Sequence, residues 1–145
     1  MKILVATDGS DYARKGVEYA AKLAIPEGGK LVLLHVVPHD PRVPPDAICF
    51  SDCIERDKKF VEELKEAGKE MLKQEAERIK DTGLDVELKV EFGDPSEETV
   101  RVANEIGANM IVIGVRGVSK WKRVLLGSVS EEVISKSDIP VFIVR

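Results

Sequence analysis

The residues with the most suggestive chemistry are glycines and serines that follow an apolar stretch near residue 110. Gly114 is followed by Gly117 and, after nine intervening residues, by Gly127 and Ser128. Glycine has no Cβ, so its backbone N–H groups can approach a ligand closely. N–H groups gathered at a helix start bind anions such as phosphate. The spacing therefore favours a phosphate-binding loop.

The charges between these glycines are all positive. Residues 115 to 126 contain no acid and four cations, Arg116, Lys120, Lys122 and Arg123, in a chain whose net charge is -4. The helix expected from Ser128 would add unpaired N–H groups, the positive end of its dipole and the hydroxyls of Ser128 and Ser130. Local positive charge in an acidic chain fits a polyphosphate.

An ordinary structural role is open for each feature taken alone. Ser128 to Glu131 has the pattern of a capping box, and Gly127 could serve only the turn before it. Neither G-x4-G-K-[ST] nor G-x-G-x-x-G occurs, which disfavours P-loop NTPases and standard dinucleotide folds. The combination of glycines, helix start and cations still favours an anion site.

Strand-length apolar runs alternate with helical patterns along the whole chain. The expected strands are residues 3–6, 31–37, 86–92, 110–113 and 141–144. The expected helices are residues 11–25, about 54–81, 95–106 and 128–136, and residues 38–52, with four prolines, are expected to form a loop. This alternation predicts one α/β domain over residues 1–145, with a mainly parallel sheet and helices on both faces.

Local signals support these elements. Ser10 is expected to cap the first helix, and Asp94, with Pro95 and Glu97 after it, is expected to cap the third. Strict alternation in residues 86–92 predicts a strand near a sheet edge. The buried stripe expected on the long helix is Val61, Leu64, Gly68, Met71, Leu72, Ala76 and Ile79.

Ligands of such sheets lie beyond the carboxyl ends of the strands, where the strand order reverses. The residues at those positions are Thr7–Gly9, Val36–Val37, Gly93–Asp94 and the segment from Gly114 onward. These four places are therefore the first candidates for a binding site.

The spacing G-x2-G-x9-G-S, formed by Gly114, Gly117, Gly127 and Ser128, resembles the nucleotide-binding signature of the universal stress protein family. The similarity covers essentially the whole chain, through residues 3–10, 33–36, 93–95 and 137–141. It implies a Rossmann-like, three-layer fold with an open five-stranded sheet of order 3-2-1-4-5. That order reverses between the first and fourth strands, which end near Asp8 and Gly114.

The resemblance implies ATP as the ligand. Ala6, Thr7 and Asp8 would line the adenosine pocket, and the backbone of Val36 would read the adenine edge. The residues implied for the ribose and phosphates are Gly114, Arg116, Gly117, Gly127, Ser128, Val129 and Ser130, and Ile113 is a further nucleotide-binding candidate. Mg²⁺ or Mn²⁺ would be held by the phosphates themselves. Val115 stands where many relatives carry Ser or Thr, which removes a hydroxyl and is expected to leave the backbone donors in place.

Three functions remain open at this point. The first is an ATP-binding regulatory protein of the stress response with an unidentified protein partner. The second is a slow ATP hydrolase or nucleotidyl-transfer enzyme, and the third is a dimeric interaction module without nucleotide. The intact glycine signature disfavours the third. The loop offers cations and no positioned general base, so binding without efficient turnover is expected and no catalytic residue is assigned.

Two other kinds of site are disfavoured. A response regulator would need an acidic pair after the first strand and a lysine after the fifth, and both are missing. His35, His39, Cys49 and Cys53 fit no common zinc-finger spacing, so structural roles are expected for them. The role of Trp121 is left open.

The composition and the last predicted strand limit the expected location and partners of the protein. The chain of 145 residues is 43% apolar and 33% charged, which is typical of a globular protein. No stretch approaches the ~20 apolar residues of a membrane span, and the acidic balance disfavours nucleic acid and anionic membranes. A cytoplasmic location is expected. The apolar edge strand Val141–Val144 predicts a two-fold homodimer, with coverage by residues 38–52 as the alternative.

Overall fold

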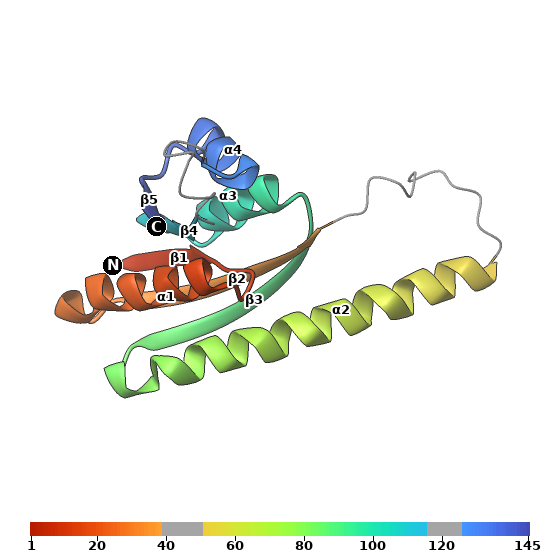
Figure 1. Cartoon of the computed structure of the whole chain (residues 1–145), viewed down its shortest axis with the longest axis horizontal. Helices are drawn as coiled ribbons and strands as arrows, with labels where there is room; N and C mark the ends of the chain where they lie inside the picture. Colours follow the sequence, from red (N-terminus) through yellow and green to blue (C-terminus); the bar gives the residue numbers. More distant parts are fainter. Residues whose placement is uncertain (39–50, 116–125) are drawn as a thin grey trace.

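The computed structural model describes residues 1–38, 51–115 and 126–145, with the side chains of 51–57 left aside. Its five parallel strands form one sheet of order β3-β2-β1-β4-β5 (Figure 1). The strands are β1 (Lys2–Ala6), β2 (Lys30–Pro38), β3 (Asp85–Gly93), β4 (Met110–Gly114) and β5 (Val141–Val144). The helices are α1 (Asp11–Ala24), α2 (Ser51–Arg78), α3 (Pro95–Glu105) and α4 (Ser128–Lys136). The predicted Rossmann-like fold and strand order are confirmed.

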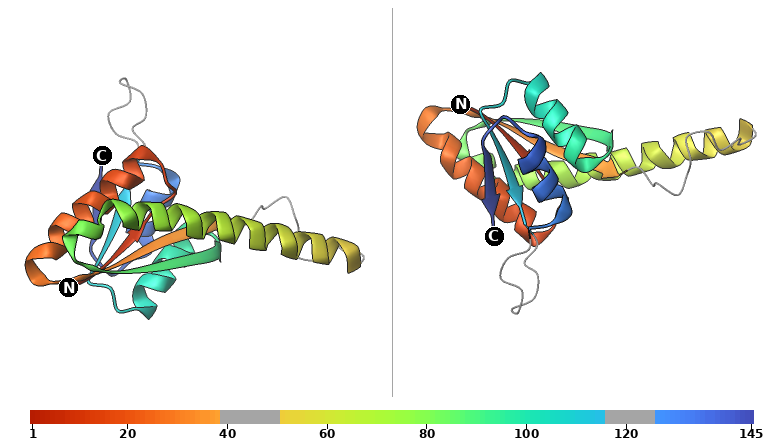
Figure 2. Two further views of the ribbon diagram at one scale, coloured as in Figure 1. Left: turned by 90° about the horizontal axis from the view of Figure 1, so that it is seen from below. Right: turned by 90° about the horizontal axis from the view of Figure 1, so that it is seen from above.

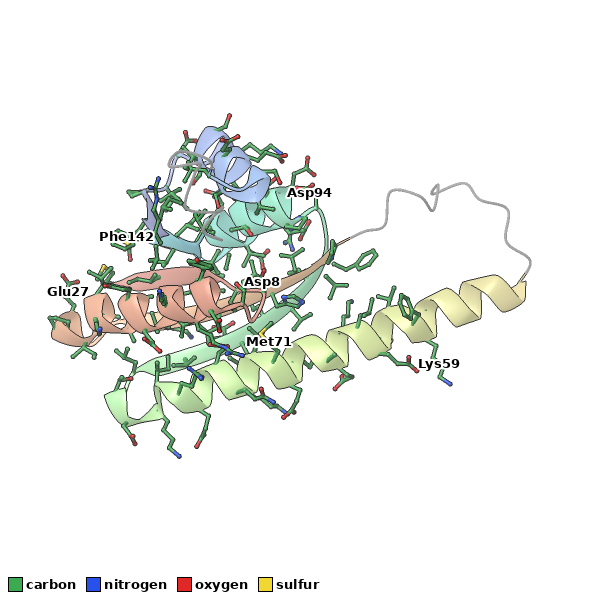
Figure 3. All side chains as sticks on the ribbon, viewed as in Figure 1. Asp8, Glu27, Lys59, Met71, Asp94 and Phe142 are labelled. Atoms are coloured by element: carbon green, nitrogen blue, oxygen red, sulfur yellow. The ribbon has the colours of Figure 1, made fainter. Side chains whose placement is uncertain are left out.

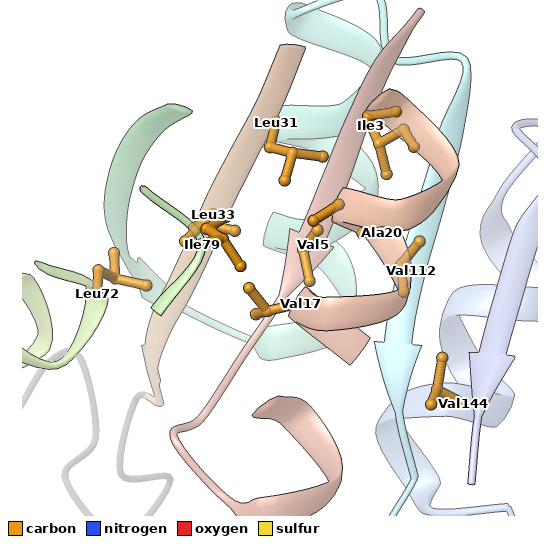
Figure 4. Close-up of a cluster of buried hydrophobic side chains, with 12 residues drawn as sticks. Ile3, Val5, Val17, Ala20, Leu31, Leu33, Leu72, Ile79, Val112 and Val144 are labelled. Atoms are coloured by element: carbon orange, nitrogen blue, oxygen red, sulfur yellow. The ribbon is translucent and has the colours of Figure 1, made fainter. Parts of the chain in front are cut away.

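Helices cover both faces of the sheet, so the fold has three layers (Figure 2). Successive residues of a strand point to opposite faces. Ile3 and Val5 of β1 therefore pack in the cluster under α1 and α2, shown in Figure 4, and Leu4 packs in the cluster under α3 and α4. Burial from both faces explains why the central strands are apolar throughout.

The strand order reverses at β1. The chain leaves β1 through α1 and returns as β2 on one side, and it later returns through α3 as β4 on the other. Ala6 is the last residue of β1 in register with both neighbours, opposite Leu34 of β2 and Ile113 of β4. Beyond Ala6, no strand of residues 1–38, 51–115 and 126–145 lies between β2 and β4, which is the place predicted for a ligand.

The expected capping residues begin two of the helices. The Ser10 hydroxyl accepts a hydrogen bond from the Ala13 N–H at the start of α1. Asp94 accepts from the Ser96 and Glu97 N–H groups at the start of α3. Hydrogen bonds from the Ser96 hydroxyl and the Glu97 N–H hold the pKa of Asp94 below its ordinary value. The Glu97 carboxylate lies 3.7 Å from Lys136 Nζ on α4 instead of completing the predicted capping box.

The long helix α2 differs from its prediction at both ends. It begins at Ser51, and it ends at Arg78 because residues Lys80–Thr82 tighten into a 3-10 turn closed by Gly83 at φ 69°. Leu72 is fully buried as predicted, but Leu64 is 36% exposed. The prediction for Leu64 was wrong because α2 extends well past the strands that it covers (Figures 1 and 2).

The edge positions of β3 and β5 agree with the sequence. No helix in residues 1–38, 51–115 and 126–145 combines the length and apolar character that a membrane span requires.

Candidate functional site

The carboxyl edge of the sheet gathers the described site candidates. Ala6, Thr7 and Asp8 lie where β1 turns into α1, Val36 lies near the end of β2, and Ile113 and Gly114 end β4. Residues Gly127 to Ser130 begin α4, which starts at the same edge because it leads back to the amino end of a parallel strand, β5. Gly117, Arg116 and the three other cations of the loop lie outside the described residues.

Thr7 is the anchor of the β1 end. Its N–H donates to Leu34 O at 2.9 Å, and its hydroxyl accepts from the Gly9 N–H at 3.2 Å. The side chain is buried, whereas the next residue, Asp8, is exposed and accepts from the Ser10 N–H at 2.9 Å. Asp8 is therefore held at the surface of the edge in a short turn that leads into α1.

Val36 presents main-chain groups where β1 has already ended. In a parallel ladder, residues i and i+2 point their N–H and C=O groups to the same neighbouring strand. Leu34 O accepts from Thr7, so the main chain of Val36 also points to the β1 side, two residues beyond the last register pair Ala6–Leu34. This geometry suits recognition of a planar hydrogen-bonding edge.

Gly114 is a glycine because α1 packs directly against it. A Cβ on Gly114 would lie 2.1 Å from Tyr12 O and 2.6 Å from Ala13 N. Both atoms belong to the first turn of α1. Ile113, the residue before, packs its buried side chain under α3 and α4. The two residues thus fix the end of β4, and Gly114 has a structural reason to be glycine whether or not a ligand binds.

Gly127 differs from Gly114 in this respect. It is the N-cap of α4 with φ −64° and ψ 156°, a conformation open to any residue, and a Cβ there would meet nothing within 4 Å. Among the described residues no side chain caps α4. The capping-box alternative for Ser128 is wrong, because Gly127 is the N-cap and Ser128 is the first helical residue and is exposed. The first N–H groups of an α-helix have no partner within the helix.

The structure also gives the positions of Val115, Val129 and Ser130. Ser130 is buried, and Val129 packs against the cluster under α4, so the hydroxyl of Ser128 is the more accessible of the two. The Val115 N–H donates to Val144 O at 2.8 Å. That donor serves the sheet and is not available to a ligand.

Sequence reasoning treated His35 as structural without finding its place. Its Nδ1 lies 3.0 Å from Thr7 O. A carbonyl oxygen only accepts, so Nδ1 carries the proton and donates. His35 therefore ties β2 to the end of β1, beside the candidate site. No sequence signal marked this contact, because the partner is a main-chain atom.

Comparison with known proteins assigns the chain. The model of the universal stress protein family matches residues 1–145. Universal stress protein YxiE of Bacillus subtilis is 34% identical over 148 residues, covering 99% of this chain and 98% of the relative.

The chain belongs to the universal stress protein family.

Two solved structures of the family were determined with nucleotides. One is a universal stress protein from Archaeoglobus fulgidus in complex with dAMP, with 28% identity, a TM-score of 0.69 and coverage of 100% of this chain and 98% of that one. The other is a universal stress protein in complex with cAMP, with 26% identity, a TM-score of 0.70 and coverage of 100% and 96%. Both ligands are adenine nucleotides.

The contrast between the two glycines of this universal stress protein gives a stability prediction. Gly114→Ala should lower the free energy of unfolding by about 1–3 kcal/mol, because the new methyl group overpacks against the backbone of α1. Gly127→Ser should leave it unchanged or raise it by a few tenths of a kcal/mol, because serine is a good N-cap. Urea unfolding followed by circular dichroism measures both. Equal losses in the two variants would contradict the different roles assigned to these glycines.

Proposed function

We propose that this universal stress protein binds ATP at the carboxyl edge, between the ends of β1 and β4, and acts as a nucleotide-dependent regulatory protein of the stress response. The observation that carries the proposal is the start of α4. In the part of the chain that the structure describes, its N–H groups have no side-chain cap and nothing requires glycine at position 127. A phosphate group explains both facts, because it accepts from those N–H groups and needs the space that a Cβ would take.

The adenosine half of the proposed site is formed by β1 and β2. The open main-chain groups of Val36 would recognise the adenine edge, with Ala6, Thr7 and Asp8 beside the adenosine. The dAMP and cAMP complexes of the two relatives support an adenine nucleotide as the ligand class. These roles follow from the resemblance of the whole chain to the family. Each of these residues lies at the carboxyl edge of the sheet, which supports the proposal.

A triphosphate is proposed because of charge. Residues 115 to 126 contain four cations and no acid, which is more positive charge than one phosphate group needs. Arg116 and Gly117 would contact the phosphates from this segment. Mg²⁺ or Mn²⁺ would enter with ATP and be held by its phosphate oxygens, as is usual for nucleotide-bound Mg²⁺.

Binding without efficient hydrolysis is the proposed mode of action. Cleavage of ATP needs a group that orients or deprotonates the attacking water. Asp8 is the one carboxylate among the proposed site residues, and it accepts a hydrogen bond from the Ser10 N–H in the turn before α1, on the adenosine side. A slow hydrolase is the alternative, and release of inorganic phosphate well above a protein-free blank would favour it.

Thermal unfolding with and without Mg-ATP tests the proposal. ATP at about 100 times its Kd should stabilise the protein by ~2.7 kcal/mol. For a chain of this size, the Tm should rise by an amount on the order of 5–10 °C. Gly127→Ser should abolish this rise, because its side chain caps the N–H groups and fills the approach, while the Tm of the free protein stays the same.

Two results would contradict the proposal. If millimolar Mg-ATP left the wild-type Tm unchanged, the protein would not be an ATP-binding protein. If Gly127→Ser kept the full rise, the phosphates would bind elsewhere. Parallel titrations with dAMP and cAMP identify the preferred nucleotide.

We also propose a homodimer through β5. This strand is at an edge, and Phe142 is 39% exposed. Pro140 O and Val144 O accept hydrogen bonds from β4, so the main chain of Ile143, one residue away, points outward from the sheet. Antiparallel pairing with a two-fold copy of the strand would use these outward groups.

Ile143→Pro tests the dimer, because proline removes an outward N–H and leaves the ladder to β4 intact. Light scattering after size-exclusion chromatography should show a dimer for the wild type and a monomer for Ile143→Pro. Ile143→Ala is the control: it removes most of the same side chain, keeps the N–H and should remain dimeric. A monomeric wild type, or a dimeric proline variant, would rule out pairing through this strand.

A further inference from the structure

The long helix α2 contacts the end of β1 as well as the strands that it covers. A Cβ on Gly68 of α2 would lie 2.8 Å from His35 Cδ2. The helix therefore lies directly against the imidazole that donates to Thr7 O. One turn further along α2, Met71 lies against the turn after Thr7: a Cβ on Gly9 would be 3.0 Å from Met71 Cγ. Figure 3 shows Met71 on the side of α2 that faces Asp8.

A third contact joins α2 to the first turn of α1. Arg14 Nε donates to Glu75 Oε1 at 3.2 Å, and the Glu75 side chain is only 3% exposed. The other end of the guanidinium is 3.3 Å from Asp11 Oδ1. The Arg14 N–H donates to Ser10 O at 2.9 Å. Glu75 therefore holds the turn of α1 that follows the β1 end.

That same turn is packed against β4. Tyr12 O and Ala13 N leave no room for a Cβ on Gly114. The first turn of α1 is thus placed between Gly114 on one side and Glu75 on the other. The residues before it, Thr7 and Asp8, belong to the proposed adenosine side, and Gly114 belongs to the phosphate side. The position of this one turn sets the spacing between the two halves of the site.

The Arg14–Glu75 pair is poorly built for stability. Glu75 Oε2 is buried and has no hydrogen-bond partner among the described residues. Arg14 is 41% exposed, so water screens its charge. A buried carboxylate with an unsatisfied oxygen is costly, and apolar side chains of similar size often replace a buried ion pair with no loss of stability. Stability alone therefore does not account for the pair, whereas fixing α1 relative to α2 does.

We propose that Glu75, acting through Arg14, is a positioning residue for the nucleotide site. It does not touch the nucleotide. It holds the first turn of α1 against Gly114 so that the β1 end and the β4 end have the spacing that an adenine nucleotide needs. This inference rests on the proposed ATP site, and it adds α2 to the elements that determine affinity.

The test variant replaces both partners, Arg14→Met with Glu75→Met, which removes the ion pair and leaves two unbranched apolar side chains, close in length to Glu at position 75 and shorter than Arg at position 14. The matched control is Glu18→Met with Arg78→Met. Glu18 and Arg78 also join α1 to α2, at 3.9 Å, but both are half exposed and Glu18 is one helical turn further from the site. Glu75→Gln is the conservative variant, because its amide oxygen can still accept from Arg14 Nε.

Calorimetric titration with Mg-ATP well below the Tm, together with the Tm of each free protein, separates positioning from stability. The test variant should keep or raise the Tm and bind Mg-ATP roughly 3- to 30-fold more weakly, the range typical of residues that act on a site through contacts. The control pair should bind as the wild type does, and Glu75→Gln should recover most of the affinity. In the nucleotide-free proteins, the amide resonances of Gly9 and Gly114 should both move in the test variant and stay in place in the control.

Three outcomes would overturn the inference. They are unchanged affinity in the test variant, equal weakening in the control pair, and a fall in affinity that only follows a fall in Tm. Unmoved Gly9 and Gly114 resonances would also overturn it, and this readout needs no ligand. If the wild type itself bound no Mg-ATP, the proposed function would be wrong. The titration of the wild type tests that point separately from the comparison of the variants.

Discussion

The close approach of α1 to the end of β4 is the contact on which the rest of the site depends. Only a glycine at position 114 lets the carbonyl of Tyr12 lie where it does, because any Cβ would overlap it. The approach places the start of α1 beside the end of β4, at the point where the strand order reverses. It also fixes where the turn with Thr7 and Asp8 leaves β1. The relative position of the β1 and β4 ends follows from this contact.

The glycines of the family signature therefore have different physical reasons. Gly114 is required by the packing of the protein itself, since a Cβ at this position would overlap the backbone of α1. Among the described residues, none lies within 4 Å of a Cβ on Gly127, and none caps the helix that it begins. The proposed phosphate site gives a reason for the second glycine, whereas the first needs no ligand to explain it. The loss of folding stability expected for Gly114→Ala therefore comes from the packing of α1 against β4 and not from the loss of a phosphate contact.

Much of the fold could be predicted from the sequence, because it depends on local signals. Apolar runs such as residues 31–37 mark buried strands, and Asp94 and Ser10 mark helix starts by their own chemistry. The extent and buried face of the helix from Ser51 to Arg78 are harder to predict. Its periodicity continues where the sheet beneath it has ended, so the pattern placed Leu64 in the core although nothing covers it fully.

The site could be predicted only in part. The glycine spacing pointed to Gly127, and the alternation of strands and helices pointed to the β1 end, because both patterns run along the chain. Glu75 carried no such signal: it lies 61 residues from Arg14, on a helix rich in charged residues, and only the fold shows that it is buried. His35 carried none either, because its partner is the main-chain oxygen of Thr7. Neither long-range pairing nor a main-chain partner is marked by residue type or spacing.

The most direct measurement of the central claim is an amide nitrogen–proton NMR titration of the wild-type protein with Mg-ATP. The resonances of Gly127, Ser128 and Val129 at the start of α4 should move most, together with those of Thr7 and Val36. Glycines at the opposite edge of the sheet, Gly29 and Gly107, should stay in place. Movement confined to the opposite edge, or no movement at saturating nucleotide, would contradict an ATP site between β1 and β4.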